Sequence, residues 1–144
     1  MTRIDFYVLS NDDLMERLQL ICKLSEKAIG QAQKVFIHSD SEEELNQLDQ
    51  SLWDFRSISF VPHKVLPQGY VTSSLDNEPV HLSSNEPAAD RTLLINLANE
   101  VPTFFSRFER TLEVINDEPE IKASGRLRYR YYQQRGYPLH HHKM

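Results

Sequence analysis

Apolar and polar residues alternate at the start of the chain, and the pattern then changes to a helical period. Ile4, Phe6 and Val8 alternate within RIDFYVLS, which predicts a first β-strand. After SNDD, apolar positions recur at the spacing of one helix face (Leu14, Leu18, Ile21, Cys22 and Ala28). Gly30 suits the end of that helix. KVFIH follows as a short buried strand.

A second helix is predicted from Ser41 to Trp53. Ser41 and Glu44 form a capping box, in which the serine side chain accepts the Glu44 N–H and the glutamate reaches back. Leu45, Leu48 and Leu52 then share one helix face. The order strand, helix, strand, helix is typical of βαβ units, so we expect a mostly parallel sheet in an α/β fold.

The second half of the chain contains further short apolar runs. Strands are predicted at 58–61, at 80–84 on a sheet edge, at 91–97 in the sheet centre and at 111–115 as the last strand. A short helix is expected at 101–109 and a loop at 64–79. We find no repeat and no linker, so the prediction is a single domain over residues 1–144.

The final helix, from about residue 116 to Gly136, has the clearest boundaries. Asn116 and Asp117 can cap it, Pro119 fits its first turn and Gly136 fits its stop. Its helical period predicts a face of Ala123, Leu127 and Tyr131 toward the sheet. Next to this face lies a basic stripe of Lys122, Arg126, Tyr129 and Arg130, and Arg128 is expected outside it. Gly125 costs about 1 kcal/mol in a helix interior, so either it permits close packing or it has no role.

Charge is distributed unevenly along the 144 residues. Residues 1–120 carry 10 basic and 21 acidic residues, whereas residues 121–144 carry six basic residues and no acidic one. This asymmetry indicates an acidic partner at the C-terminal end.

The single cysteine, Cys22, excludes an intrachain disulfide. No apolar run is long enough to span a membrane and no signal peptide is recognisable, so a cytoplasmic protein is expected.

Several kinds of chemistry are disfavoured. The turn SNDDL after the first strand has no glycine and two carboxylates, so it cannot hold a pyrophosphate, and no nucleotide or other cofactor is expected. Asp12, Asp13 and Asp40 could converge with His38 as in a metal-dependent hydrolase, but caps and solvated turns explain the carboxylates equally well, and His38 fits capping or packing. Residues 139–144, which include the run HHHKM, are expected to be a flexible tail without a metal.

The chain also resembles a known family. The resemblance rests on DFYVL, LDQSLWDFRSISFVPH (48–63), EPVHL, LLINL, FERTLEVI and the terminal RYRYYQQRGYPL, which occur in the family's order. These motifs are similar to the chi subunit of the bacterial DNA polymerase III clamp loader. The resemblance implies one three-layer Rossmann-like domain without a nucleotide-binding loop and without enzymatic activity.

The resemblance further implies two protein partners and only indirect contact with DNA. The first is the C-terminal tail of the single-stranded-DNA-binding protein, which is acidic and ends in Asp-Phe-Pro-Phe. Its receptor residues correspond here to Arg126 for the terminal carboxylate, Ile115 and Tyr129 for the last Phe, and Lys122 and Arg130 for the acidic residues.

The second implied partner is the psi subunit or, in some bacteria, a helicase of the XPD type. The corresponding residues are Trp53, Phe60, Val61, Pro62 and His63. Trp53 could equally belong to the core, and strand alternation puts Phe60 on the face of Ile58. A competing function is direct binding of single-stranded nucleic acid by the basic, aromatic final helix.

Overall fold

A computed structural model describes residues 1–54, 61–73 and 75–144. The described helices are α1 (Leu14–Gly30), α2 (Glu42–Asp54) and α3 (Pro119–Gln134), with one 3-10 turn, η1 (Phe105–Arg107). The described strands are β1 (Arg3–Val8), β2 (Val35–His38), β3 (His63–Leu66), β4 (Val80–Ser83), β5 (Leu93–Asn96), β6 (Arg110–Ile115) and β7 (Leu139–Lys143).

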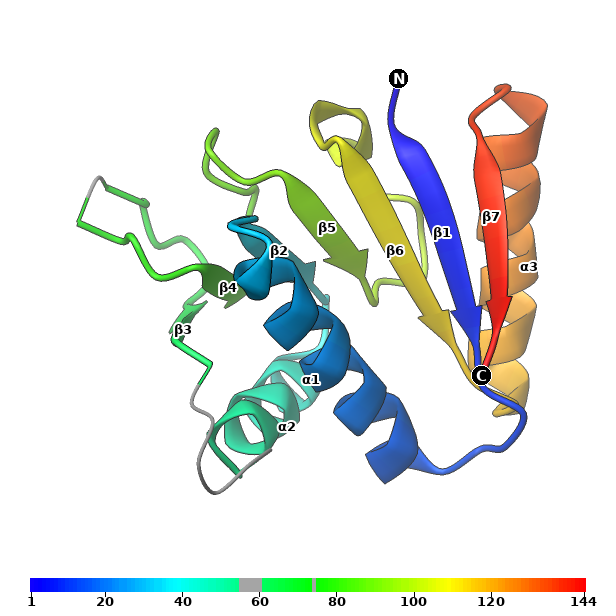
Figure 1. The fold of residues 1–144 in the computed structure, drawn as a ribbon, viewed down its shortest axis with the longest axis horizontal. Helices are drawn as coiled ribbons and strands as arrows, with labels where there is room; N and C mark the ends of the chain where they lie inside the picture. The colour runs from blue at the N-terminus through cyan, green and yellow to red at the C-terminus, as the bar shows by residue number, and fades with distance from the viewer. Residues whose placement is uncertain (55–60, 74) are drawn as a thin grey trace.

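The strands form one open sheet in the order β3-β4-β2-β5-β6-β1-β7. All six strand pairings are parallel, which confirms the predicted α/β class. Helices α1 and α2 lie on one face of the sheet and α3 lies on the other, so the fold has the three layers of a Rossmann-like domain (Figure 1). We refer to these as the α1 face and the α3 face.

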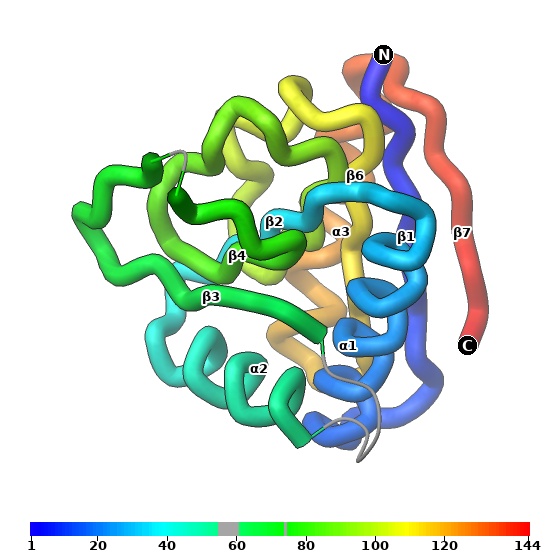
Figure 2. The backbone as a smooth tube through the Cα atoms, turned by 60° about the vertical axis from the view of Figure 1, so that its left-hand side comes forward, coloured from blue at the N-terminus to red at the C-terminus, as the bar shows by residue number. Residues whose placement is uncertain are grey.

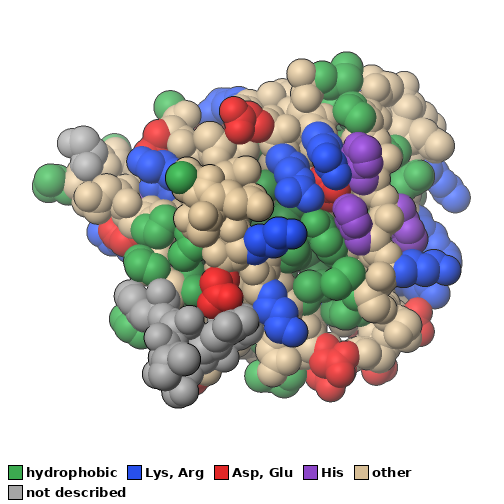
Figure 3. Space-filling view, in the orientation of Figure 1, with side chains coloured by type: hydrophobic (Ala, Val, Ile, Leu, Met, Phe, Trp, Pro, Cys, Tyr) green, Lys and Arg blue, Asp and Glu red, His purple; other side chains and the backbone are tan. Residues whose placement is uncertain are grey.

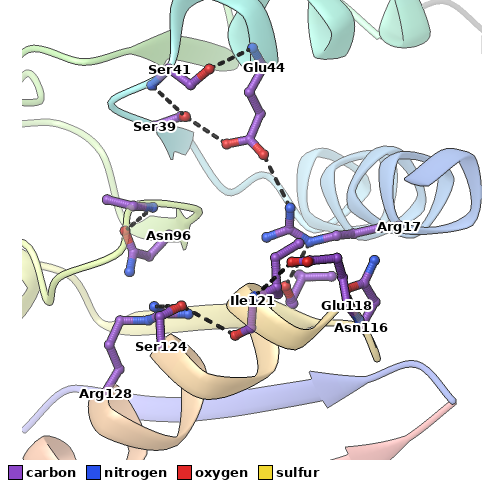
Figure 4. Close-up of polar contacts among 12 residues, drawn as sticks. Arg17, Ser39, Ser41, Glu44, Asn96, Asn116, Glu118, Ile121, Ser124 and Arg128 are labelled. Atoms are coloured by element: carbon purple, nitrogen blue, oxygen red, sulfur yellow. Dashed lines mark hydrogen bonds and ion pairs between the residues drawn. The ribbon is translucent and has the colours of Figure 1, made fainter. Parts of the chain in front are cut away.

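Local capping fixes where the helices begin. The Asp13 carboxylate accepts hydrogen bonds from the backbone N–H groups of Met15 and Glu16, at 2.8 and 3.4 Å. At α2, Ser41 Oγ accepts the Glu44 N–H at 3.2 Å, as the capping box predicts. The Glu44 side chain does not reach back to Ser41; it accepts from Ser39 Oγ, and Ser39 Oγ accepts the Ser41 N–H (Figure 4).

Alternation along β1 divides the core between the two faces. Ile4 and Phe6 are buried on the α3 face with Tyr132 and the phenylalanines around η1. Tyr7 and Leu9 point to the α1 face and pack, partly exposed, against the core made by α1, α2 and the central strands. Strand β5 lies in the middle of the sheet and is fully buried, as its apolar run predicts.

The structure corrects several predicted elements. Strand β4 lies between β3 and β2 rather than on an edge. A strand forms at His63–Leu66, most of it within residues 64–79, the predicted loop, whereas the predicted strand at 58–61 falls mainly outside the described residues. The helix expected at 101–109 is only the turn η1, because Phe104, Phe105 and Phe108 all bury their rings under the sheet.

The C-terminal segment is a strand and not a flexible tail. Strand β7 pairs in parallel with β1 along its whole length and forms the edge of the sheet (Figure 2). His142 stacks on Tyr7 with ring centroids 4.5 Å apart, and its Nε2 lies 2.8 Å from Asp5 Oδ1. The run HHHKM is polar and has no apolar alternation, so nothing in it predicts a strand that pairs with β1. For this reason the sequence predicts a flexible tail.

Asp5 therefore links the N-terminal and C-terminal strands. Burial of this carboxyl raises its pKa, but hydrogen bonds from Arg110, His142 and Arg3 outweigh the effect and lower the pKa from 3.8 to about 2. A carboxyl with a lowered pKa in the folded state stabilises the fold above its unfolded pKa, and this contribution is lost as pH falls through the folded value.

We predict that Asp5→Asn lowers the free energy of unfolding by about 1–3 kcal/mol at pH 7. The difference between the two proteins should disappear between about pH 5 and pH 1, because Asp5 is then protonated in the parent protein. Urea unfolding at a series of pH values measures it. A difference that stays constant over this range would contradict the role given to the carboxylate.

Candidate functional site

Helix α3 is held in place at both ends. Glu118 is its N-cap, and the side chain accepts the Ile121 N–H at 3.0 Å, while Asn116 Oδ1 accepts the Glu118 N–H at 3.1 Å (Figure 4). Pro119 occupies the first turn, as predicted. Gly136 follows the helix with φ +76°, a left-handed conformation that favours glycine. The chain then turns directly into β7.

A buried polar network fixes the rotation of α3. Glu113 on β6 is fully buried; its carboxylate accepts from Arg128 Nε at 2.9 Å, from the Tyr132 hydroxyl at 2.8 Å and from Asn96 Nδ2 at 3.0 Å. Arg128 Nη1 also donates to Asn99 O, and to Ser124 Oγ one helical turn earlier (Figure 4). Burial, together with Glu113, raises the pKa of Tyr132.

The buried face of α3 is therefore not the predicted one. Gly125, Arg128 and Tyr132 face the sheet, whereas Ala123 and Leu127 are exposed and Tyr131 is half-buried. Hydrophobic periodicity alone predicts that the arginines of an amphipathic helix lie on its solvent-exposed side. Here the buried Glu113 requires a cationic partner, and the cost of leaving it unpaired is larger than the free energy that burying Leu127 would gain.

Gly125 is the point of closest approach between α3 and the sheet. A Cβ atom built at this position would lie 2.8 Å from Ile115 Cδ1 and 3.3 Å from Ile115 Cγ1. Of the two roles open to Gly125, close packing is the one that the structure supports. The absence of a side chain also leaves space beside Ile115.

That space opens into a cavity of about 350 Å³ between α3 and the strands β1, β6 and β7. We call it the α3 cavity. Its wall is formed by the apolar side chains of Phe6, Val8 and Ile115 with the ring of Tyr129, which meets Phe6 edge to face at 5.2 Å. A concave apolar wall with a few polar groups at its rim is the usual form of a ligand site. The remaining lining residues are Lys122, Gly125, Arg126 and His141.

The rim of the α3 cavity is basic. Arg126 is exposed, and its guanidinium has no hydrogen-bond or ion-pair partner within the described part of the chain. Lys122 Nζ lies 3.0 Å from Asp117 Oδ1, in an exposed pair that is worth little. A ligand with one apolar end and a carboxylate could bury the first and pair the second with Arg126.

Four of the five residues expected at this site come together. Ile115, Lys122, Arg126 and Tyr129 line the α3 cavity, whereas Arg130 is exposed and does not line it. Sequence reasoning missed Phe6, Val8 and His141. The alternation of β1 marks Phe6 and Val8 as one face of a strand, but nothing in the sequence indicates that β7 pairs beside β1 and brings His141 to the rim.

The second expected surface is only partly described. The Trp53 side chain is 54% exposed, so it does not belong to the core, and its ring meets His63 edge to face at 5.1 Å. His63 is buried, with Nε2 2.8 Å from Asp49 Oδ1. Val61 lies in the hydrophobic core and Pro62 is half-buried, so the side chain of Val61 is not available to a partner. Phe60 lies outside the described residues.

The carboxylates considered for a metal-dependent hydrolase have separate roles. Asp13 caps α1, and Asp40 is exposed, 3.8 Å from His38 Nε2. His38 is buried, stacks on Phe36, and its Nδ1 lies 3.1 Å from Ser83 O, which makes it a packing residue. Residues 1–54, 61–73 and 75–144 contain no group of three metal-ligating side chains. Within the same ranges, no helix is long and apolar enough to cross a membrane.

Residues 1–140 match the family model described as "DNA polymerase III chi subunit, HolC". The chain belongs to the chi-subunit family. Among its relatives, the DNA polymerase III subunit chi of Pseudomonas aeruginosa is 40% identical, over all of this chain and 98% of its own length. The subunit chi of Escherichia coli is 27% identical over 96% of each chain, and that of Haemophilus influenzae 26% over 93% of this chain and 92% of its own.

Membership in the chi family confirms the resemblance seen in the sequence and places the protein among the accessory subunits of DNA polymerase III. The residues that carried the resemblance fall on very different parts of this chi-family fold. LLINL is the central strand β5, FERTLEVI leads into β6, and RYRYYQQRGYPL runs from α3 into β7. The basic stripe thus belongs to a surface built by both ends of the chain.

We predict that Arg128→Ala lowers the free energy of unfolding by about 3–5 kcal/mol, because Glu113 would then be buried without its cationic partner. Arg126→Ala, two residues earlier on the same helix but exposed, should change it by less than about 0.5 kcal/mol. Chemical denaturation of the two variants and the parent protein measures both values. Equal effects would mean that Arg128 does not anchor α3.

Proposed function

We propose that this chi-family protein is a non-catalytic accessory subunit that binds the acidic C-terminal tail of the single-stranded-DNA-binding protein in the α3 cavity. The observation that supports it most directly is that the apolar wall of the α3 cavity lies beside the Arg126 guanidinium, which has no partner in the described part of the chain. Ile115 and Tyr129 would receive the last Phe of the tail, and Arg126 its terminal carboxylate.

Charge around the cavity suits the rest of such a tail. Lys122 can exchange its exposed pairing with Asp117 for an aspartate of the ligand at little cost. Arg130 lies one helical turn after Arg126, outside the cavity, where it could meet an acidic residue farther from the terminal Phe. His141 on β7 adds a third polar group at the rim, beside Lys122 and Arg126.

We also propose that the exposed Trp53, together with Pro62, contributes to a second surface for the psi subunit or an XPD-like helicase, and that the buried His63 supports the Trp53 ring. Trp53 is a large aromatic residue on the surface, a type that often anchors protein interfaces. It lies at the end of α2 on the α1 face, whereas α3, which forms one wall of the α3 cavity, lies on the other face (Figure 1). Both partners could therefore bind together, and through these two partners the protein would contact DNA indirectly.

We predict that Arg126→Ala weakens binding of a peptide ending in Asp-Phe-Pro-Phe by about 1.5–3 kcal/mol, or tenfold to a hundredfold. Amidating the peptide's C-terminus should have a similar effect. The two changes together should not add, because they remove the same contact. Calorimetric titration of the four combinations gives the coupling energy.

Arg107→Ala is the matched control, since Arg107 is an exposed arginine on η1, away from the α3 cavity. It should leave peptide affinity within about twofold of the parent protein, a difference of about 0.4 kcal/mol. If the amidated peptide binds as well as the free acid, or if Arg107→Ala weakens binding as much as Arg126→Ala, the cavity is not a carboxylate receptor. The helix would then act as a diffuse basic surface.

We predict that Gly125→Ala weakens the same peptide about tenfold while leaving the protein folded. The new methyl group would meet Ile115 Cδ1, which must move into the space that receives the Phe ring. Alanine gains about 1 kcal/mol of helix propensity over glycine, which offsets part of the strain. A peptide with the last Phe replaced by Ala should lose much less affinity for this variant than for the parent protein, and calorimetry tests both.

A further inference from the structure

A second part of the surface is unusual for a parallel sheet. Parallel sheets are normally covered on both faces, because their strands are apolar on both sides. Helix α3 covers β1 on one face, where Ile4 and Phe6 are buried. On the other face α1 packs against β2 and β6, and no helix of the described chain lies over β1 and β7 (Figure 1). This half of the α1 face is open to solvent.

The polar side chains on this open half are mostly arginine, lysine and histidine. Strands β1, β6 and β7 contribute Arg3, Arg110, His140 and His142, at neighbouring positions of the sheet register. Lys27 on α1 borders the same depression as Tyr7 and Arg110. Figure 3 shows Lys, Arg and His side chains gathered around a hydrophobic floor on this side of the molecule. We call this set the basic sheet face: Arg3, Tyr7, Lys27, Arg110, His140 and His142.

The carboxylate among these groups does not cancel their charge. Asp5 is fully buried beneath them and binds both Arg3 and Arg110, at 3.1 and 2.7 Å. Two guanidinium groups therefore share one negative charge. Each arginine uses Nε and Nη2 in its contacts, which leaves Nη1 without a partner in the described chain. A positive patch on a chain of net charge −5 points to an anionic ligand.

The shape of the basic sheet face indicates which class of anionic ligand it suits. Its depression beside Tyr7 has a volume of only about 80 Å³, against about 350 Å³ for the α3 cavity. A protein partner generally needs a socket for an apolar anchor, and this face offers none of that size in the described residues. Spread cations beside an aromatic pair, Tyr7 and His142, suit a flexible polyanion that binds by charge and by stacking.

We infer that the basic sheet face binds single-stranded nucleic acid through its phosphate backbone. Arg3, Lys27 and Arg110 would pair with successive phosphates, and the Tyr7–His142 pair would contact the bases. The α3 cavity opens on the opposite face of the sheet, so a ligand there leaves this face free. The inference does not depend on the peptide-binding function proposed above.

The test uses the full chain and a fluorescently labelled 20-nucleotide oligo-dT, followed by anisotropy at several salt concentrations. For about three phosphate contacts, the slope of log affinity against log salt should be near −2. The double variant Arg3→Glu with Lys27→Glu should weaken binding at least tenfold. Arg110 is left intact, because its bond to the buried Asp5 is shorter than that of Arg3 (2.7 against 3.1 Å) and its side chain is less exposed (30% against 47%).

The matched control is Arg107→Glu with Arg135→Glu, which changes the net charge equally at two exposed positions away from this face. It should change oligo-dT affinity less than threefold, and Arg126→Ala should not change it. Circular dichroism melting shows that each variant is folded. Three results would overturn the inference: no binding at 50 mM salt, equal losses in the two double variants, or displacement of the oligonucleotide by equimolar poly-glutamate, which would indicate an acidic protein partner.

Discussion

The buried ion pair between Glu113 and Arg128 determines what the rest of the α3 surface can do. A carboxylate inside the sheet must be hydrogen-bonded and paired, and Arg128, Tyr132 and Asn96 together meet this need. Three of these four groups sit on β6 and α3, so the network locks the helix at one rotation. That rotation turns Gly125 toward Ile115 and leaves Arg126 facing solvent.

The α3 cavity follows from this orientation and from the missing side chain of Gly125. If the apolar residues of α3 had set its rotation, Leu127 would be buried and Arg126 would lie elsewhere. The cost of an unpaired buried glutamate is larger than the gain from burying one leucine, so the polar network decides. Local capping by Glu118 and the turn at Gly136 fix the length of the helix, and the pairing of β7 with β1 then closes the far side of the cavity.

Asp5 has a comparable role at the sheet edge. It joins β1 to Arg110 on β6 and to His142 on β7, so the last strand is held by a contact with the first. The same contacts gather cations on the open half of the α1 face. The protein thus presents basic groups on both faces of one sheet edge, although its overall charge is negative.

The sequence by itself determined the order of α1, α2 and α3, the parallel sheet, the central place of β5 and the basic character of the last helix. Each of these depends on local period, capping or composition. The sequence motifs also indicated membership in the chi family, and through this resemblance they indicated four of the residues that line the α3 cavity. Only the tertiary structure decided the rotation of α3, the strand at Leu139–Lys143, and the positions of Phe6 and His141 in the lining of the α3 cavity. These features rest on contacts between residues more than a hundred positions apart or on a buried charge pair, and neither leaves a periodic signal in the chain.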